Sequence, residues 1–130
     1  MIVLRDDHEI DRAALGELYR SVGWGERAAD PGRLEAVVRG SLWVASAWDE
    51  GHLVGFARAI SDGVTTAYVT DVMVAESHQR RGIASALVKR LMAGREEIHF
   101  VLRAQPEHHP LYQKVGFVPA PTMLRRPRAR

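Results

Sequence analysis

Residues 72–88 constrain the fold of this chain more than any other part of the sequence. Residues 64–75 are rich in valine, threonine and tyrosine, the β-branched and aromatic types that suit a strand. After a polar turn, apolar side chains recur at helical spacing up to Gly94; they are Ala84, Leu87, Val88, Leu91 and Met92. The segment predicts a long central strand that leads directly into an amphipathic helix, and therefore a fold that mixes strands and helices.

The predicted start of this helix is suited to bind an anion. Its N-terminal residues run from Arg80 to Ser85. A helix start has unpaired backbone N–H groups and the positive end of the helix dipole, so a phosphate can be held there by the main chain. Gly82 and Ala84 are small enough for a close approach, and Arg80 and Arg81 add positive charge. The segment lacks the Gly-Lys-Ser/Thr of a P-loop and the three-glycine dinucleotide motif.

The other patterned segments predict a single mixed α/β domain. A short strand at residues 2–4 precedes a helix at 11–22 and a second helix that begins after Asp30. Residues 42–45 and 53–57 flank an Asp-Glu-Gly turn and predict a hairpin. A strand at 98–102, a helix that ends at Gly116, and strand pieces near Phe117 and Met123-Leu124 complete the order. We expect one domain over residues 1–124 and a basic tail at 125–130.

Composition excludes several classes of chemistry. The 130 residues contain no cysteine, so disulfides, thiolate metal sites and a cysteine nucleophile are absent. His108 and His109 are adjacent, so their side chains diverge, and no third ligand has suitable spacing; we predict no metal site. Any catalysis must use other groups.

Charge and hydropathy place further limits on partners. The formal net charge of +2 depends on the four arginines of the tail, without which 14 basic residues stand against 16 acidic ones. Aromatic and basic residues do not alternate along any one strand, as they do in many nucleic-acid binders, so we do not expect a nucleic-acid partner. No window resembles a membrane span or a leader peptide, and we expect a cytoplasmic protein.

Three short motifs resemble those of one enzyme superfamily. Residues 79–84, Gln-Arg-Arg-Gly-Ile-Ala, match the Q/R-x-x-G-x-G/A signature of the GNAT superfamily of acyl-CoA-dependent N-acyltransferases. Residues 111–117 resemble the superfamily's Tyr-x-x-x-Gly-Phe segment, and residues 21–24, Ser-Val-Gly-Trp, resemble the end of its first helix. With the order of elements, the resemblance covers residues 2–124 and identifies the chain as a small, single-domain member.

The resemblance implies a fold and a cosubstrate site. In that fold the fourth and fifth strands of a mixed sheet splay apart, about four helices flank the sheet, and the pantetheine arm of acetyl-CoA pairs with the fourth strand. Carried over to this sequence, Met73 and Val74 would pair with pantetheine. The pyrophosphate would be bound by seven consecutive residues further along the chain: Gln79, Arg80, Arg81, Gly82, Ile83, Ala84 and Ser85.

The resemblance also implies a reaction, in which a primary amine attacks the thioester directly. Tyr112 matches the tyrosine that donates a proton to the departing thiolate. Asp71 is the candidate for the base or for binding the ammonium group, and Trp24 would line the acceptor site. Alternation along the strand puts Asp71 on one face with Val69 and Met73. Each of these side chains also has a purely structural reading as a packing residue, a cap or a solvated group.

The acceptor and the oligomeric state stay open from sequence. Glu26 and Asp30, between the first two predicted helices, suggest a cationic acceptor, and a homodimer is compatible with the resemblance. The alternative function is a GNAT-like module without catalysis, which binds CoA or nucleic acid.

Overall fold

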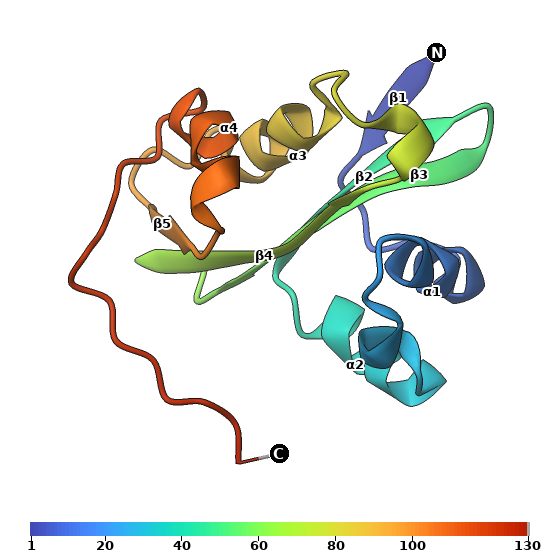
Figure 1. The fold of residues 1–130 in the computed structure, drawn as a ribbon, viewed down its shortest axis with the longest axis horizontal. Coiled ribbons are helices and arrows are strands. Elements are labelled where there is room, and N and C mark those ends of the chain that lie inside the picture. Colours follow the sequence, from blue (N-terminus) through green and yellow to red (C-terminus); the bar gives the residue numbers. More distant parts are fainter. Residues whose placement is uncertain (130) are drawn as a thin grey trace.

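The computed structural model describes residues 1–129, in which one five-stranded sheet carries helices on both faces (Figure 1). The strands are β1 (Ile2–Arg5), β2 (Trp43–Asp49), β3 (His52–Ser61), β4 (Thr66–Val74) and β5 (His99–Leu102). The α-helices are α1 (Arg12–Ser21), α2 (Pro31–Arg39), α3 (Ile83–Met92) and α4 (His109–Gln113). Three short 3₁₀ helices are η1 (Gly25–Ala28), η2 (Glu76–His78) and η3 (Pro106–His108). The predicted mixed α/β fold is confirmed.

The sheet is antiparallel from β1 to β4 and parallel between β4 and β5, in the order β1-β2-β3-β4-β5. The predicted hairpin is formed by β2 and β3. Its turn residues Glu50 and Gly51 have φ of 50° and 80°, and a two-residue turn with both φ values positive matches the twist of the flanking strands. Asp30 caps α2 as predicted, since its carboxylate accepts a hydrogen bond from the Gly32 N–H at 2.9 Å.

Each face of the sheet has its own core. On one face α3 packs through Ile83, Leu87 and Leu91, and on the other α1 and α2 pack against Phe56 and neighbouring apolar side chains. The two layers are visible in Figure 1. Helix α3 lies very close to β3, because a Cβ atom on Gly55 would stand 3.0 Å from the Leu87 Cδ1 atom and 3.2 Å from the Ile83 Cγ2 atom. The start of α3 is therefore fixed against the centre of the sheet.

Strands β4 and β5 are paired over only half of β4. The parallel register joins Thr66–Val69 of β4 to His99–Leu102 of β5. Beyond Val69, residues 70–74 of β4 continue without β5, so one edge of this half of β4 is open. This is the splayed sheet that the sequence resemblance implied.

Two predicted features are wrong. The strand pieces near Phe117 and Met123-Leu124 do not form within residues 1–129, where β5 is the last strand. Pro119 and Pro121 lie in this segment and have no N–H group to donate to a ladder, and Leu124 is 95% exposed. Helix α3 begins at Ile83 rather than at Arg80. Residues 125–129 of the tail carry no helix or strand, and Arg130 lies outside the described residues.

Candidate active site

The loop between β4 and α3 leaves the start of α3 without a side-chain cap. Gly82 is the N-cap residue, with φ of 80°, and Arg80 also has a positive φ, of 65°. The first hydrogen bond of the helix runs from the Ala86 N–H to the Gly82 carbonyl oxygen at 3.0 Å. The N–H groups that precede Ala86 are therefore not used by the helix ladder. They point out of a ten-residue helix at the positive end of its dipole, where an anion is favoured.

The side chains of the predicted phosphate-binding residues differ in their exposure to solvent. Arg80, Arg81 and Gly82 are exposed, whereas the Ile83 side chain is only 5% exposed and belongs to the core. Ile83 can therefore offer only its main chain. Arg81 is turned back within the loop, since its Nη2 atom donates to the Ser77 carbonyl oxygen at 3.3 Å.

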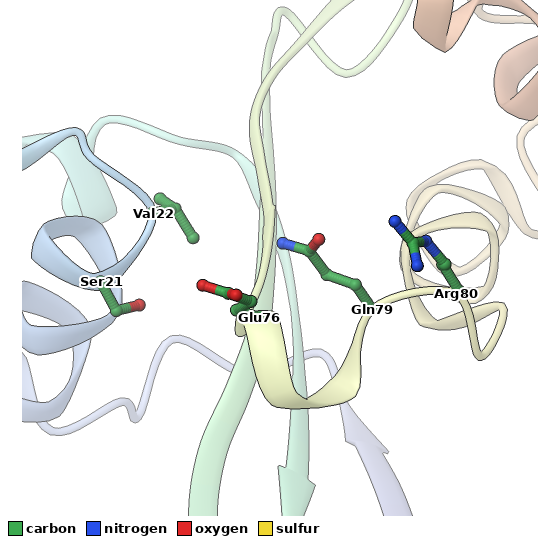
Figure 2. Close-up of a pocket in the computed structure, with 5 residues that line it drawn as sticks. All are labelled: Ser21, Val22, Glu76, Gln79 and Arg80. Carbon is green, nitrogen blue, oxygen red and sulfur yellow. The ribbon is translucent and has the colours of Figure 1, made fainter.

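A cavity of about 430 Å³ lies in front of this loop and reaches the end of α1. Its lining residues are Ser21, Val22, Glu76, Gln79 and Arg80. Figure 2 shows Val22 on one side, Gln79 and Arg80 on the other, and Glu76 between them. The segment at the end of α1 thus faces the loop between β4 and α3.

The open edge of β4 offers main-chain groups next to the loop. The Ala75 N–H donates to the Val54 carbonyl oxygen of β3 at 2.8 Å. Because main-chain groups alternate along a strand, those of Val74 face away from β3. The Val74 carbonyl accepts from the Gln79 side chain at 3.0 Å. By the same alternation the main chain of Met73 faces β3, where it pairs with Phe56. Val72 lies where the register with β3 shifts and is a further candidate for contacts at the open edge.

A bulge in β4 reverses the expected orientation of Asp71. Asp71 has φ of 53°, and the pairing of β3 with β4 shifts between Phe56 and Arg58. An extra residue in one strand interrupts the alternation of faces. Val69 consequently packs on the α3 side of the sheet, whereas Met73 packs on the α1 side. The expectation that Asp71 shares a face with Val69 was therefore wrong, although it does share one with Met73.

The Asp71 side chain, which is 5% exposed, is surrounded by three donors from three elements. The Tyr19 hydroxyl donates to it at 2.6 Å, the Arg27 Nη1 at 2.6 Å and the Arg58 Nε at 2.8 Å. Burial opposes ionisation of this carboxyl group, but the hydrogen bonds from Tyr19 and Arg58 outweigh it, so the pKa of Asp71 is lowered. Burial and the Asp71 charge raise the pKa of Tyr19. No local pattern in the sequence brought these four residues together.

Trp24 and Arg27 form the exposed side of this cluster. The Arg27 guanidinium lies over the Trp24 ring, 4.4 Å from its centroid. A second cavity, of about 490 Å³, is lined by the end of α1 and by η1: Arg20, Gly23, Trp24, Gly25, Glu26 and Arg27. The structure thus brings the predicted residues Trp24 and Asp71 together, with Arg27 between them.

Tyr112 lies in the short helix α4, on the α3 side of the sheet (Figure 1). Its ring meets the edge of Phe117, with centroids 6.0 Å apart, and its carbonyl accepts from the Phe117 N–H at 3.1 Å. Gly116, with φ of 106°, allows the chain to reverse between the two rings. Burial raises the pKa of Tyr112, so the phenol is protonated at neutral pH and has a proton to donate.

Within residues 1–129, no group of three or more His, Cys, Asp or Glu side chains is arranged to hold a metal ion. Over the same residues, no helix has the length and hydropathy needed to cross a membrane.

Comparisons with known proteins agree on one family. A family model described as an acetyltransferase (GNAT) domain matches residues 39–119. The chloroplastic serotonin N-acetyltransferase 2 of Oryza sativa subsp. japonica is 33% identical over an alignment of 130 positions. The alignment covers 95% of this chain and 64% of that protein. The chain thus spans less than two thirds of the rice enzyme. Because that enzyme is named chloroplastic, the cytoplasmic location stays a prediction.

Solved structures are also similar to this chain. A protein assigned to the GNAT family from Xanthomonas campestris pv. campestris has a TM-score of 0.80 at 27% identity and covers 97% of this chain and 92% of its own. An aminoglycoside N-acetyltransferase in complex with CoA has a TM-score of 0.77 at 16% identity and covers 100% of this chain and 96% of its own. At 16% identity, the similarity to the aminoglycoside enzyme shows a shared fold and nothing more.

Proposed function

Because the chain belongs to the GNAT family of acetyltransferases, we propose that it transfers the acetyl group of acetyl-CoA directly to a primary amine, in a ternary complex and without an acyl-enzyme. The observation that carries this proposal is the uncapped start of α3, which follows the open edge of β4 after the loop of residues 75–82. An edge that can pair with an extended amide chain lies next to an anion site, and acetyl-CoA contains both of these parts.

The residues of this region fit such a cosubstrate. The main chain of Val72 and Val74 would pair with the pantetheine amides, and Gln79 would hold the Val74 carbonyl in place. The N–H groups at residues 82–85 would bind the pyrophosphate, with Arg80 adding positive charge. A Cβ atom on Gly82 would meet nothing within 4 Å, so no other protein atom crowds this position of the loop.

The proposed acetyl transfer needs no covalent enzyme intermediate. The amine nitrogen attacks the thioester carbonyl carbon, a C–N bond forms, and the C–S bond breaks to release the thiolate of CoA. We assign Tyr112 as the general acid that protonates this thiolate, because it is the tyrosine of the Tyr-x-x-x-Gly-Phe segment at residues 112–117. The absence of cysteine agrees with direct transfer.

The proton that the amine loses needs an acceptor. Asp71 stays a candidate for this role, but its lowered pKa and its three donors make it a weak base. Its contacts support a different role, in which Asp71 orients Arg27 and Tyr19 at the acceptor side. Under this proposal a water molecule accepts the proton.

The proposal is tested by measuring free thiol from acetyl-CoA over a panel of amines, together with calorimetric binding of acetyl-CoA. Thiol release that depends on an added amine supports the enzyme. Binding of acetyl-CoA without turnover for any amine would instead support a CoA-binding module. Absence of acetyl-CoA binding would refute both readings of the site.

A further inference from the structure

We propose that the amine acceptor carries a carboxylate group and that Arg27 binds this carboxylate; the inference rests on the proposed acetyl transfer. The starting observation is an excess of positive charge around Asp71, where we expect the acceptor to bind. Asp71 supplies one negative charge, whereas Arg27 and Arg58 supply two positive charges, both within hydrogen-bonding distance of it. The cluster therefore has a net charge of +1 around a buried carboxylate.

The excess charge is accessible at Arg27 and not at Arg58. The Arg58 side chain is 15% exposed, whereas that of Arg27 is 49% exposed. A guanidinium has five N–H donors, and the contact with Asp71 uses the Nη1 atom of Arg27. The guanidinium also lies over the Trp24 ring, 4.4 Å from its centroid. Arg27 is thus held from two sides, which lowers the entropy lost when it binds a second carboxylate.

The lining of the cavity beside Arg27 also has a net positive charge. Its lining residues include Arg20 and Arg27 as cations and Glu26 as the one acid. Asp30, which the sequence suggested as part of a cationic-acceptor site, is used as the cap of α2. The charges therefore favour an anionic group on the acceptor over a polycationic acceptor, opposite to the expectation from sequence.

Position along the chain connects this cavity to the reaction. Asp71 directly precedes Val72, the first residue proposed to pair with pantetheine. A carboxylate on Arg27 would thus hold the rest of the acceptor beside the bulge of β4. Amino acids and peptide-like amines fit this chemistry, because each carries a primary amine and a carboxylate.

The test compares matched acceptors that differ only in this charge. Thiol release is measured with α- and ω-amino acids, each paired with its own carboxamide, and with polyamines. Wild-type protein should show a kcat/KM at least about tenfold higher for the acid than for the amide in at least one pair, the effect of one charge-assisted hydrogen bond. Raising the salt concentration should reduce kcat/KM for the acid and leave the amide nearly unchanged.

Two variants assign the preference to Arg27. Arg27→Gln should reduce the acid-to-amide ratio to about one, and Arg27→Lys should keep part of it, because lysine retains the charge but not the planar fork. Arg33→Gln is the control, since it removes an equal charge from the exposed surface of α2 and should keep the ratio.

The outcomes separate this inference from the proposed function. Turnover of amides or polyamines with no preference for acids would overturn the role of Arg27 and leave the acetyltransferase intact. An unchanged ratio in Arg27→Gln would also overturn it. Absence of turnover for every amine would overturn both.

Discussion

Replacing Gly82 by alanine tests the anion site at the start of α3 most directly. In the structure a Cβ atom at this position meets nothing within 4 Å. The added methyl group would project into the space where we propose that the pyrophosphate binds. The substitution also has a conformational effect, because the φ of 80° at Gly82 is unfavourable for any residue with a side chain.

Gly94 provides a matched control for that conformational effect. It follows the other end of α3, has φ of 74°, and also leaves a Cβ atom without contacts within 4 Å. Each substitution should lower the free energy of unfolding by about 1–2 kcal/mol, which corresponds to a decrease in Tm of about 4–7 °C for a domain of this size. The two variants should therefore be destabilised equally.

Only Gly82→Ala should lose affinity for acetyl-CoA. If the methyl group displaces the pyrophosphate from one charge-assisted hydrogen bond with the main chain, Kd should rise about ten- to a hundredfold. Calorimetry measures Kd for both variants, and thermal denaturation measures their stability. Equal affinities in Gly82→Ala and Gly94→Ala would refute the phosphate site, because the two variants share the strain and differ only in position.

Three further predictions concern the acid, the buried cluster and the tail. Tyr112→Phe should lower kcat by about a hundredfold, with little change in the Kd of acetyl-CoA, and a variant with normal turnover would end the general-acid assignment. Asp71→Asn should lower the free energy of unfolding at pH 7 by about 3–5 kcal/mol, because two arginines lose their carboxylate. Since the pKa of Asp71 is lowered on folding, its contribution is complete above about pH 4 and is lost as pH falls through the folded-state pKa. Urea unfolding between pH 7 and pH 3 should therefore show a smaller loss of stability in the variant than in wild type. Deleting residues 125–130 should leave the Kd of acetyl-CoA nearly unchanged, and a large increase would mean that the tail reaches the cosubstrate.

The features that sequence predicted well depend on residues close together in the chain. The strand β4, the apolar face of α3 and the cap at Asp30 follow from local spacing and residue type, and all three are present. The start of α3 was predicted too early. The positive φ values at Arg80 and Gly82 keep these residues out of the helix, and glycine at 82 was the available signal.

The predicted last strands failed for a reason that is readable in the sequence. Phe117 and Val118 are apolar and suggest a strand, but Pro119 and Pro121 follow at once. Without their N–H groups this segment cannot form a regular ladder, and Val118 is 79% exposed. The apolar residues suggested a strand, whereas the two prolines were the local signal that proved correct.

The Asp71 cluster could not be predicted, because it depends on contacts between distant parts of the chain. Its donors lie 52, 44 and 13 residues away from Asp71 in the sequence. The bulge that turns Asp71 toward them depends on the register with β3, which alternation within β4 cannot reveal.

The charges of this cluster limit what the pH dependence of the reaction can report. Folding lowers the pKa of Asp71 and raises that of Tyr19, so both move away from neutrality. Neither group changes its charge between about pH 6 and pH 9. The cluster therefore presents a constant charge of +1 to the acceptor over that range. An ionisation observed in kcat/KM near neutral pH must then belong to the amine itself or to a group outside the cluster, which distinguishes an ordering role for Asp71 from a role as the base.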